Sequence, residues 1–103
     1  EQTALDFIQK YCPEQTSPLC GNSIEHDRRF IIRYMPRLNR YLHFRHINVS
    51  TIKELLRRWY PNHPRRIFAK KETHEAMQDV KESIQELEHY RKYFFKKDTD
   101  TIE

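Results

Sequence analysis

Residues 19–24 read LCGNSI, which has the form of a short buried strand that runs into a turn. Residues 26–35 follow at once and have the apolar spacing of a helix. Residues 44–49 are a second strand candidate, short and β-branched toward its end. The alternation of strand, helix, strand and helix predicts an α/β fold that is rich in helices.

Apolar residues at steps of three and four predict the helices and their inner faces. The predicted helices are residues 4–12, ended by Pro13; residues 26–35, interrupted by Pro36 and continued through Leu38, Tyr41 and Leu42; a helix capped by Ser50 or Thr51 that runs to Trp59; and a last helix capped by Thr73 that runs to Phe94. The inner faces are expected to carry Phe30, Ile31 and Tyr34; Ile52, Leu55, Leu56 and Trp59; and Met77, Val80, Ile84, Leu87, Tyr90 or Arg91, and Phe94.

Two strands alone make a poor sheet, so further strands are expected from residues outside this chain or from a partner chain. The single glycine among 103 residues points the same way, to a helix-rich chain or a piece of something larger. Because the chain opens with Glu1 and not Met, we expect it to begin inside a longer gene product or to be processed.

The formal net charge of +4, from 19 basic and 15 acidic residues, tolerates an anionic partner without demanding one. Basic and aromatic residues neighbour each other, which suits a ligand of phosphates and bases, or simply a solvated face. The basic clusters are Arg28, Arg29 and Arg33; Arg57 and Arg58; and Arg65, Arg66, Lys70 and Lys71. Cys12 and Cys20 show no metal spacing and indicate reduced thiols in the cytoplasm. No apolar stretch approaches the ~20 residues of a membrane span.

Three titratable residues are candidates for chemistry by their positions. Asp27 lies at the start of a predicted helix, and His74 and Asp79 form a His-x4-Asp pattern at the start of the last one. Five residues turn a regular helix by about 140°, so His74 and Asp79 converge only if His74 lies in the entering loop. The alternative is that both aspartates are ordinary helix residues, Asp27 favouring a helix N-terminus, and that His74 is a surface histidine.

Three blocks of the sequence resemble motifs of the oligoribonuclease family, in that family's order and spacing. They are CGNSIEHDRRF at 20–30 with YMP at 34–36, NVSTIKEL at 48–55 with RRW at 57–59, and THEAMQD at 73–79 with Glu82-Ser83 and Glu86-Leu87 beyond. The resemblance covers about residues 4–96. It implies a ribonuclease-H-like exonuclease fold, with residues 1–96 as the C-terminal part of a single exonuclease domain and residues 97–103 as a polar tail.

The resemblance also implies a chemistry. In that family four carboxylates hold two divalent ions, usually Mg²⁺ or Mn²⁺, which prefer oxygen ligands. By match of position, Asp27 and Asp79 would be metal-binding catalytic carboxylates and His74 the general base. The positions that match the family's substrate-binding residues are Ser23, Phe44, Arg45, Ser50 and Thr51. Ser50 and Thr51 would also serve as helix caps.

The sequence departs from the family pattern at several places. The Asp-x-Glu motif of the family's first strand does not occur, so two of the four metal carboxylates are missing. We therefore expect the chain alone to bind metal poorly and to turn over little. Phe44 stands where a base-stacking tyrosine is common, and it keeps the ring but loses the hydroxyl. Asn48 replaces the usual aspartate, and Gln78 a common acidic residue.

The sequence thus favours a metal-dependent 3′-to-5′ exoribonuclease that degrades short single-stranded oligoribonucleotides to mononucleotides. We expect a homodimer in the cytoplasm, with no membrane contact. One alternative is a non-catalytic oligonucleotide-binding module derived from the same fold. Another is a helical interaction domain whose His-x4-Asp pattern is accidental. An upstream Asp-x-Glu strand in the full gene would separate the enzyme from the binding module.

Overall fold

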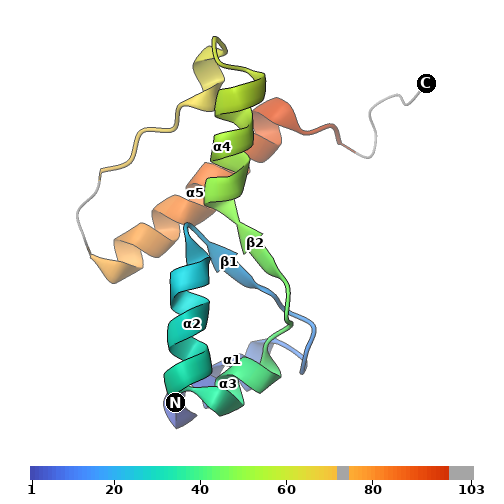
Figure 1. Cartoon of the computed structure of the whole chain (residues 1–103), viewed down its shortest axis with the longest axis vertical. Coiled ribbons are helices and arrows are strands. Elements are labelled where there is room, and N and C mark those ends of the chain that lie inside the picture. The colour runs from blue at the N-terminus through green and yellow to red at the C-terminus, as the bar shows by residue number, and fades with distance from the viewer. Residues whose placement is uncertain (72–74, 98–103) are drawn as a thin grey trace. The chain divides into compact units, whose positions relative to one another are not determined.

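The computed structural model describes residues 1–71 and 75–97 of the chain, which divides into two compact units, Glu1–Asn48 and Val49–Glu103. The first unit contains α1 (Gln2–Tyr11), β1 (Leu19–Gly21), α2 (Ile24–Tyr34), α3 (Pro36–Tyr41) and β2 (His46–Asn48) (Figure 1). The second contains α4 (Val49–Trp59), the 3-10 helix η1 (Pro64–Arg66) and α5 (Ala76–Phe94). The predicted order of strands and long helices is confirmed.

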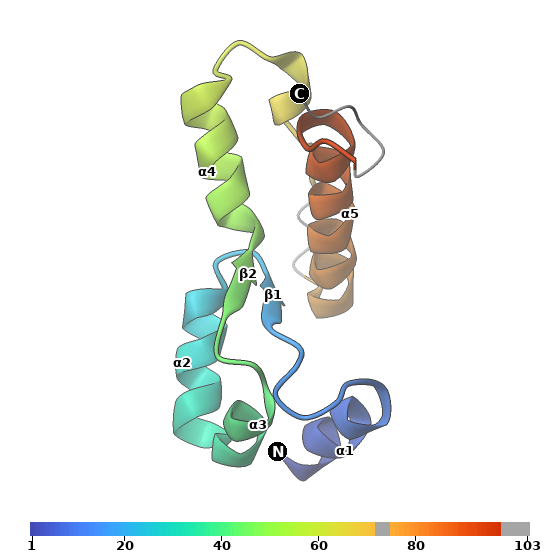
Figure 2. The same cartoon turned by 90° about the vertical axis from the view of Figure 1, so that its right-hand side faces the viewer.

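The two strands of the first unit pair in parallel and lie side by side in both ribbon views (Figures 1 and 2). The register joins Leu19 to His46, Cys20 to Ile47 and Gly21 to Asn48. A parallel pair needs a crossover connection, which α2 and α3 supply. Each strand is three residues long and therefore shorter than predicted.

Gly21 ends β1 at a place where a side chain would not fit. A Cβ atom there would lie 2.9 Å from the Cγ2 atom of Ile24, which is buried at the start of α2. Ser23 then turns the chain with φ 49° and ψ 43°, in the left-handed region that few residues other than glycine adopt. The tight step from β1 into α2 thus depends on residues 21–24.

The core of the first unit lies between α1 and α3. Its buried residues are Leu5, Leu38 and Leu42, against which Ala4, Ile8, Ile31, Met35 and Tyr41 pack. The predicted inner face of α2 is wrong in part, because Phe30 and Tyr34 are exposed. The buried residues of α2 are Ile24 and Arg28. Since an arginine occupies the inward face, apolar spacing alone pointed to the neighbouring face.

The core of the second unit also buries charged side chains. Val49, Leu56 and Tyr90 are buried, and Ile52, Phe68, Leu87 and Phe94 pack against them. The predicted apolar face of α5 is wrong at Met77, Val80 and Ile84, and that of α4 at Trp59, because all four side chains are more than half exposed. The buried residues of α5 are Glu82, Glu86 and Tyr90.

Hydrogen bonds and an ion pair allow these glutamates to be buried. Glu86, only 1% exposed, accepts a bond from the Tyr90 hydroxyl (2.5 Å) and pairs with the Lys70 ammonium (2.7 Å). The Glu82 carboxylate accepts the backbone N–H of Lys71 (3.1 Å) and a bond from the Gln78 amide (3.2 Å). A buried carboxylate is tolerated only with such partners. The two buried glutamates of α5 therefore hold Lys70 and Lys71 against the helix.

Two predicted caps differ from the observed helix ends. Helix α4 begins at Val49, directly after β2, so Ser50 and Thr51 lie in its first turn and not before it. Helix α5 has Glu75 at its N-cap, and the predicted cap Thr73 lies outside the described residues. Among the helices that the structure describes, none combines the length and apolar character needed to cross a bilayer.

Candidate functional site

The turn between β1 and α2 presents Ser23, the first predicted substrate residue. Ser23 is exposed at the N-cap of α2, and its backbone N–H donates to the Asn48 side-chain oxygen (3.1 Å). Asn48 is the last residue of β2, opposite Gly21 in the sheet. The two strands therefore bring the start of α2 and the end of β2 together, as parallel strands do at their carboxyl ends.

Asn48 also contacts a carboxylate, which explains one departure from the family pattern. Its Nδ2 atom donates to the Glu25 carboxylate (2.8 Å). An amide can accept from Ser23 and donate to Glu25 at the same time, whereas a charged aspartate could only accept. With Glu25 present, the asparagine is the residue that satisfies both neighbours.

Asp27 lies in the first turn of α2, one turn after Ser23, and its side chain is exposed. A carboxylate at this place is favoured by the positive end of the helix dipole. An exposed carboxylate can also offer both oxygens to a hard cation. Within the residues that the structure describes, no three His, Cys, Asp or Glu side chains are grouped as a metal site would require.

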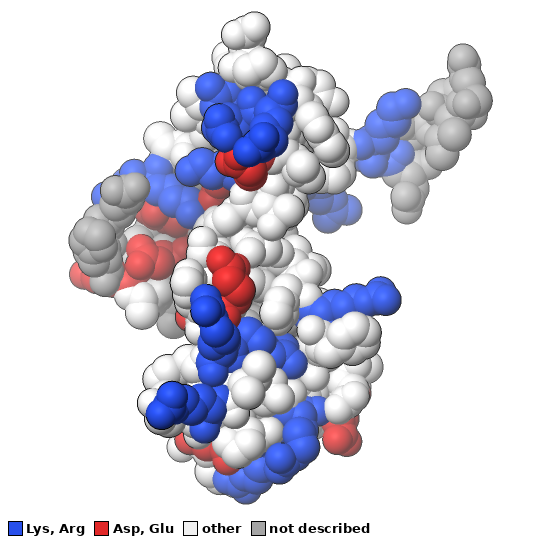
Figure 3. All heavy atoms as spheres, viewed as in Figure 1, with Lys and Arg blue, Asp and Glu red and all other residues white. Residues whose placement is uncertain are grey.

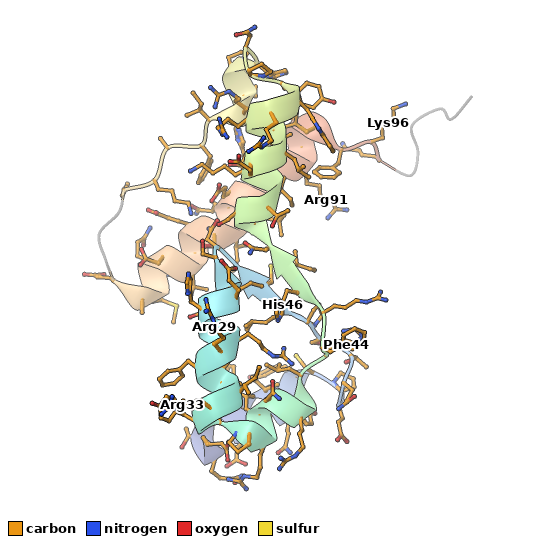
Figure 4. All side chains as sticks on the ribbon, in the orientation of Figure 1. Arg29, Arg33, Phe44, His46, Arg91 and Lys96 are labelled. Atoms are coloured by element: carbon orange, nitrogen blue, oxygen red, sulfur yellow. The ribbon has the colours of Figure 1, made fainter. Side chains whose placement is uncertain are left out.

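Phe44 and Arg45 are the next two predicted substrate residues, and they lie on the segment between α3 and β2. Figure 4 labels Phe44 on this segment. The Phe44 ring is 71% exposed and stacks on the His43 ring, with ring centroids 4.6 Å apart and an interplanar angle of 22°. The Arg45 guanidinium lies over the Phe44 ring, 5.3 Å from its centroid. The Arg45 N–H donates to His43 Nδ1 (3.1 Å). An exposed ring with a neighbouring cation can stack on a base and attract a phosphate.

Arg28, a buried residue of α2, connects the helix to this segment through its side chain. Its side chain is buried, and Nε donates to the Asn39 side-chain oxygen (2.9 Å) while Nη1 donates to the His43 carbonyl oxygen (3.1 Å). The sequence grouped Arg28 with the surface arginines Arg29 and Arg33, and the structure corrects this. The signal that could have found it is the spacing of Ile24, Arg28 and Ile31 along one helix face.

The other predicted site residues lie in the second unit. Ser50 is half-buried and Thr51 is exposed in the first turn of α4, where backbone N–H groups favour an anion. Asp79 is exposed in the first turn of α5, and its N–H donates to the Glu75 carbonyl (2.9 Å). His74 lies outside the described residues. The predicted site residues are thus divided between the units. The first unit contains Ser23, Asp27, Phe44 and Arg45, and the second contains Ser50, Thr51 and Asp79.

The acidic side chain of α4, Glu54, pairs with two of the three basic side chains of the helix. Figure 3 shows basic atoms gathered over α4 beside acidic ones. Glu54 pairs with Arg57 (2.5 Å) and with Arg58 (2.9 Å). Hydrogen bonds from these two guanidinium groups lower the pKa of the Glu54 carboxyl to about 2. Arg57 and Arg58 therefore fit the interpretation of a solvated face better than that of a phosphate site.

Comparisons with known proteins show which family the chain resembles. Residues 1–87 match the family model RNase_T, described as "Exonuclease". The chain is 50% identical over 100 residues to the oligoribonuclease of Mannheimia succiniciproducens, an alignment that covers 97% of the chain and 53% of that protein. It is 52% identical over 95 residues to the oligoribonuclease of Dichelobacter nodosus (92% and 51%), and 50% over 98 residues to that of Haemophilus influenzae (95% and 53%).

The chain thus spans about half the length of the curated relatives that it matches. The alignment with the Mannheimia succiniciproducens protein covers 97% of the chain, so it spans the blocks around Ser23, Asp27 and Asp79. The resemblance to oligoribonucleases that the motifs predicted is therefore confirmed, and by its match to the family model the chain belongs to the exonuclease family.

Proposed function

We propose that the chain is the C-terminal part of an oligoribonuclease domain that releases mononucleotides from the 3′ ends of short RNA. The observation that carries this proposal is the identity of about one residue in two to proteins named oligoribonuclease, over almost the whole chain. The first unit supports it, because it exposes a serine and a carboxylate at the turn from β1 into α2, and an aromatic ring and an arginine on the segment that leads into β2.

The chain's own residues would divide the work between substrate and metal. Asp27 and Asp79 would hold divalent cations, Mg²⁺ or Mn²⁺, and both carboxylates are exposed as this requires. Such ions would activate water and stabilise the leaving 3′ oxygen when bound. His74 would accept the proton of the attacking water, as an imidazole can near neutral pH.

The substrate would be held by its terminal phosphate and by one base. The guanidinium of Arg45, the hydroxyls of Ser23, Ser50 and Thr51, and the N–H groups at the start of α4 are donors of the kind that bind a phosphate. The Phe44 ring would stack on a base. Such stacking does not depend on the RNA sequence, because every base has a face that can stack on an aromatic ring. A phosphate bound this way would limit the length of the RNA.

The proposal extends to the assembly and the place of action. We expect a homodimer in the cytoplasm, because the resemblance implies base stacking by Phe44 across two subunits. We also expect the 103 residues alone to turn over little, because they contain no Asp-x-Glu motif to supply the other two metal carboxylates. The complete site would then need the segment that carries this motif.

A second candidate function is an oligonucleotide-binding module without catalysis. It is favoured by the exposed Phe44 and Arg45, whose ring and cation would need no metal to bind a base and a phosphate. The two functions differ in whether an upstream strand with Asp-x-Glu is part of the gene.

One experiment tests both functions. We would measure release of mononucleotide from a 5′-labelled diribonucleotide with Mn²⁺, using the 103-residue chain with and without the Asp-x-Glu segment. The enzyme proposal expects little turnover by the chain and strong turnover by the complete protein, abolished by EDTA. Binding without turnover in both preparations would favour the binding module. Strong turnover by the chain alone would contradict our assignment of the metal carboxylates.

A further inference from the structure

Residues 43–48, which we call the substrate segment, are held at both ends by polar contacts with helix α2 and its N-cap. At the start of the segment, the Arg28 guanidinium donates to the carbonyl oxygen of His43 (3.1 Å). At its end, the Asn48 side chain accepts the backbone N–H of Ser23 (3.1 Å). Between these two residues lie the exposed Phe44 and Arg45 and the first two residues of β2, His46 and Ile47.

The Arg28 contact is strong because the guanidinium is buried. Arg28 is 8% exposed, and it donates to the side chain of Asn39 (2.9 Å), the Asn39 carbonyl (3.5 Å) and the His43 carbonyl. A buried charge is tolerated only when its hydrogen bonds are made. Because all three acceptors are neutral oxygens, none can be lost without leaving the cation underbonded. His43 is therefore held by α2 through its carbonyl oxygen, and its own backbone N–H donates to the Ser17 carbonyl oxygen (3.1 Å).

The Asn48 contact fixes the other end in two directions. Its oxygen holds the N–H of Ser23, which is in a left-handed conformation, and its nitrogen holds the Glu25 carboxylate (2.8 Å). Its backbone lies in register with Gly21 in the sheet. Asn48 therefore joins the turn before α2, the first turn of α2 and the end of β2.

The residues between the two contacts are those that would hold the substrate. Phe44 and Arg45 follow His43 directly, and both pack on the His43 side chain through a ring stack and a hydrogen bond. Asp27 lies on α2 between the residues that form the two contacts, next to Arg28 in the chain. A displacement of His43 would thus move Phe44 and Arg45 relative to Asp27.

We propose that Arg28 and Asn48 are positioning residues that brace the substrate segment against α2, so that Phe44 and Arg45 meet the base and phosphate of a short oligoribonucleotide in a preformed arrangement. This inference rests on the proposed function. Neither side chain would touch the substrate, and both would act by removing freedom that binding would otherwise have to remove.

The chain offers a matched control for Arg28. Arg29 is its neighbour, carries the same charge and is exposed, and its guanidinium contacts the His26 ring (2.9 Å). We would compare Arg28→Met with Arg29→Met in two measurements. One is hydrogen exchange of the amides of residues 43–46. The other is the affinity for 5′-phosphorylated diadenylate by calorimetry, in EDTA so that no cleavage occurs.

We expect Arg28→Met to speed amide exchange in the substrate segment and to weaken diadenylate binding about tenfold or more, the loss of a charge-assisted hydrogen bond. Arg29→Met should leave the exchange unchanged and weaken binding less than about threefold. If Arg28→Met fails to fold, Asn39→Ala removes one acceptor of the same guanidinium and should show the same pattern, more weakly.

Other outcomes would overturn the inference in distinguishable ways. Faster exchange in Arg28→Met with the same affinity as Arg29→Met would show that the brace has no role in binding. Equal exchange and equal affinity in both variants would show that there is no brace. If the unmodified complete protein, with the Asp-x-Glu segment, does not bind diadenylate at all, this would contradict the proposed function itself, and the inference with it.

Discussion

At the scale of single residues, the contact between Asn48 and Glu25 makes a sharp prediction. The Asn48 Nδ2 atom donates to the Glu25 carboxylate at 2.8 Å. Asn48→Asp would replace this hydrogen bond by two carboxylates that face each other. We expect a loss of about 1–2 kcal/mol in the free energy of unfolding, from the lost bond and the like charges. Urea unfolding at neutral pH would measure it.

The double variant Asn48→Asp with Glu25→Gln is the control for this prediction. A glutamine at position 25 can donate to the new aspartate, so most of the stability should return. A double-mutant cycle gives the coupling energy between the two positions. Additive losses of stability in the cycle would mean that the contact between Asn48 and Glu25 does not contribute to stability. Another cause would then have to explain why position 48 is an asparagine.

Phe44 belongs to the same scale, because its ring alone would hold a base. Phe44→Ala should weaken diadenylate binding about fivefold to a hundredfold, the usual contribution of one base stacked on an aromatic ring. Phe44→Tyr keeps the ring and should bind within about threefold of the unmodified chain. Equal binding by Phe44→Ala, again by calorimetry in EDTA, would remove Phe44 from the site.

At the scale of secondary-structure elements, α5 depends on a buried carboxylate. Glu86→Ala would leave the Lys70 ammonium and the Tyr90 hydroxyl without their shared partner. Breaking a buried pair in this way should lower the free energy of unfolding by about 3 kcal/mol. Glu88→Ala, an exposed glutamate on the same helix, should change it by less than about 0.5 kcal/mol. Equal losses would contradict a structural role for Glu86.

Tyr90 adds a pH dependence to the same element. Burial and the hydrogen bond to Glu86 raise the pKa of the Tyr90 phenol above its ordinary value. Because the folded state keeps the proton longer than the unfolded state, this contribution is full below about pH 10 and is lost as the pH rises further. The stability difference between the unmodified chain and Tyr90→Phe should therefore shrink above about pH 10. Tyr93→Phe is the control, and a difference independent of pH would contradict this origin.

The helices and strands were easier to predict from the sequence than the faces that the helices bury. Strand, helix and turn patterns are local, so the order and the approximate ends of α1, α2, α4 and α5 followed from apolar spacing and proline. The inner faces did not, because polar residues that are satisfied by distant partners occupy them. Arg28 is buried because of Asn39 and His43, and Glu86 because of Lys70 and Tyr90. No local pattern contains those partners.

At the scale of the whole molecule, the site residues were predictable only through the resemblance to a family. Asp27 and Asp79 are exposed aspartates in first turns of helices, a common place for an acidic residue. The roles that we propose for them would depend on one another and on the carboxylates of an Asp-x-Glu motif, which does not occur in the 103 residues, and no property of either residue alone reveals such roles. Pairs such as Asn48 and Glu25 likewise needed the structure, because the two residues lie 23 positions apart.

The same dependence gives the prediction that matters most for the complete protein. Asp27→Ala or Asp79→Ala should each abolish turnover, because a two-metal site that loses one carboxylate binds its ions poorly. Since both side chains are exposed, neither change should alter the free energy of unfolding by more than about 0.5 kcal/mol. Mononucleotide release from a labelled diribonucleotide, with thermal unfolding in parallel, measures both effects. Asp6→Ala, which removes an exposed carboxylate outside the proposed site, is the matched control and should retain activity. Turnover that survives in either variant would show that the metal ligands lie elsewhere.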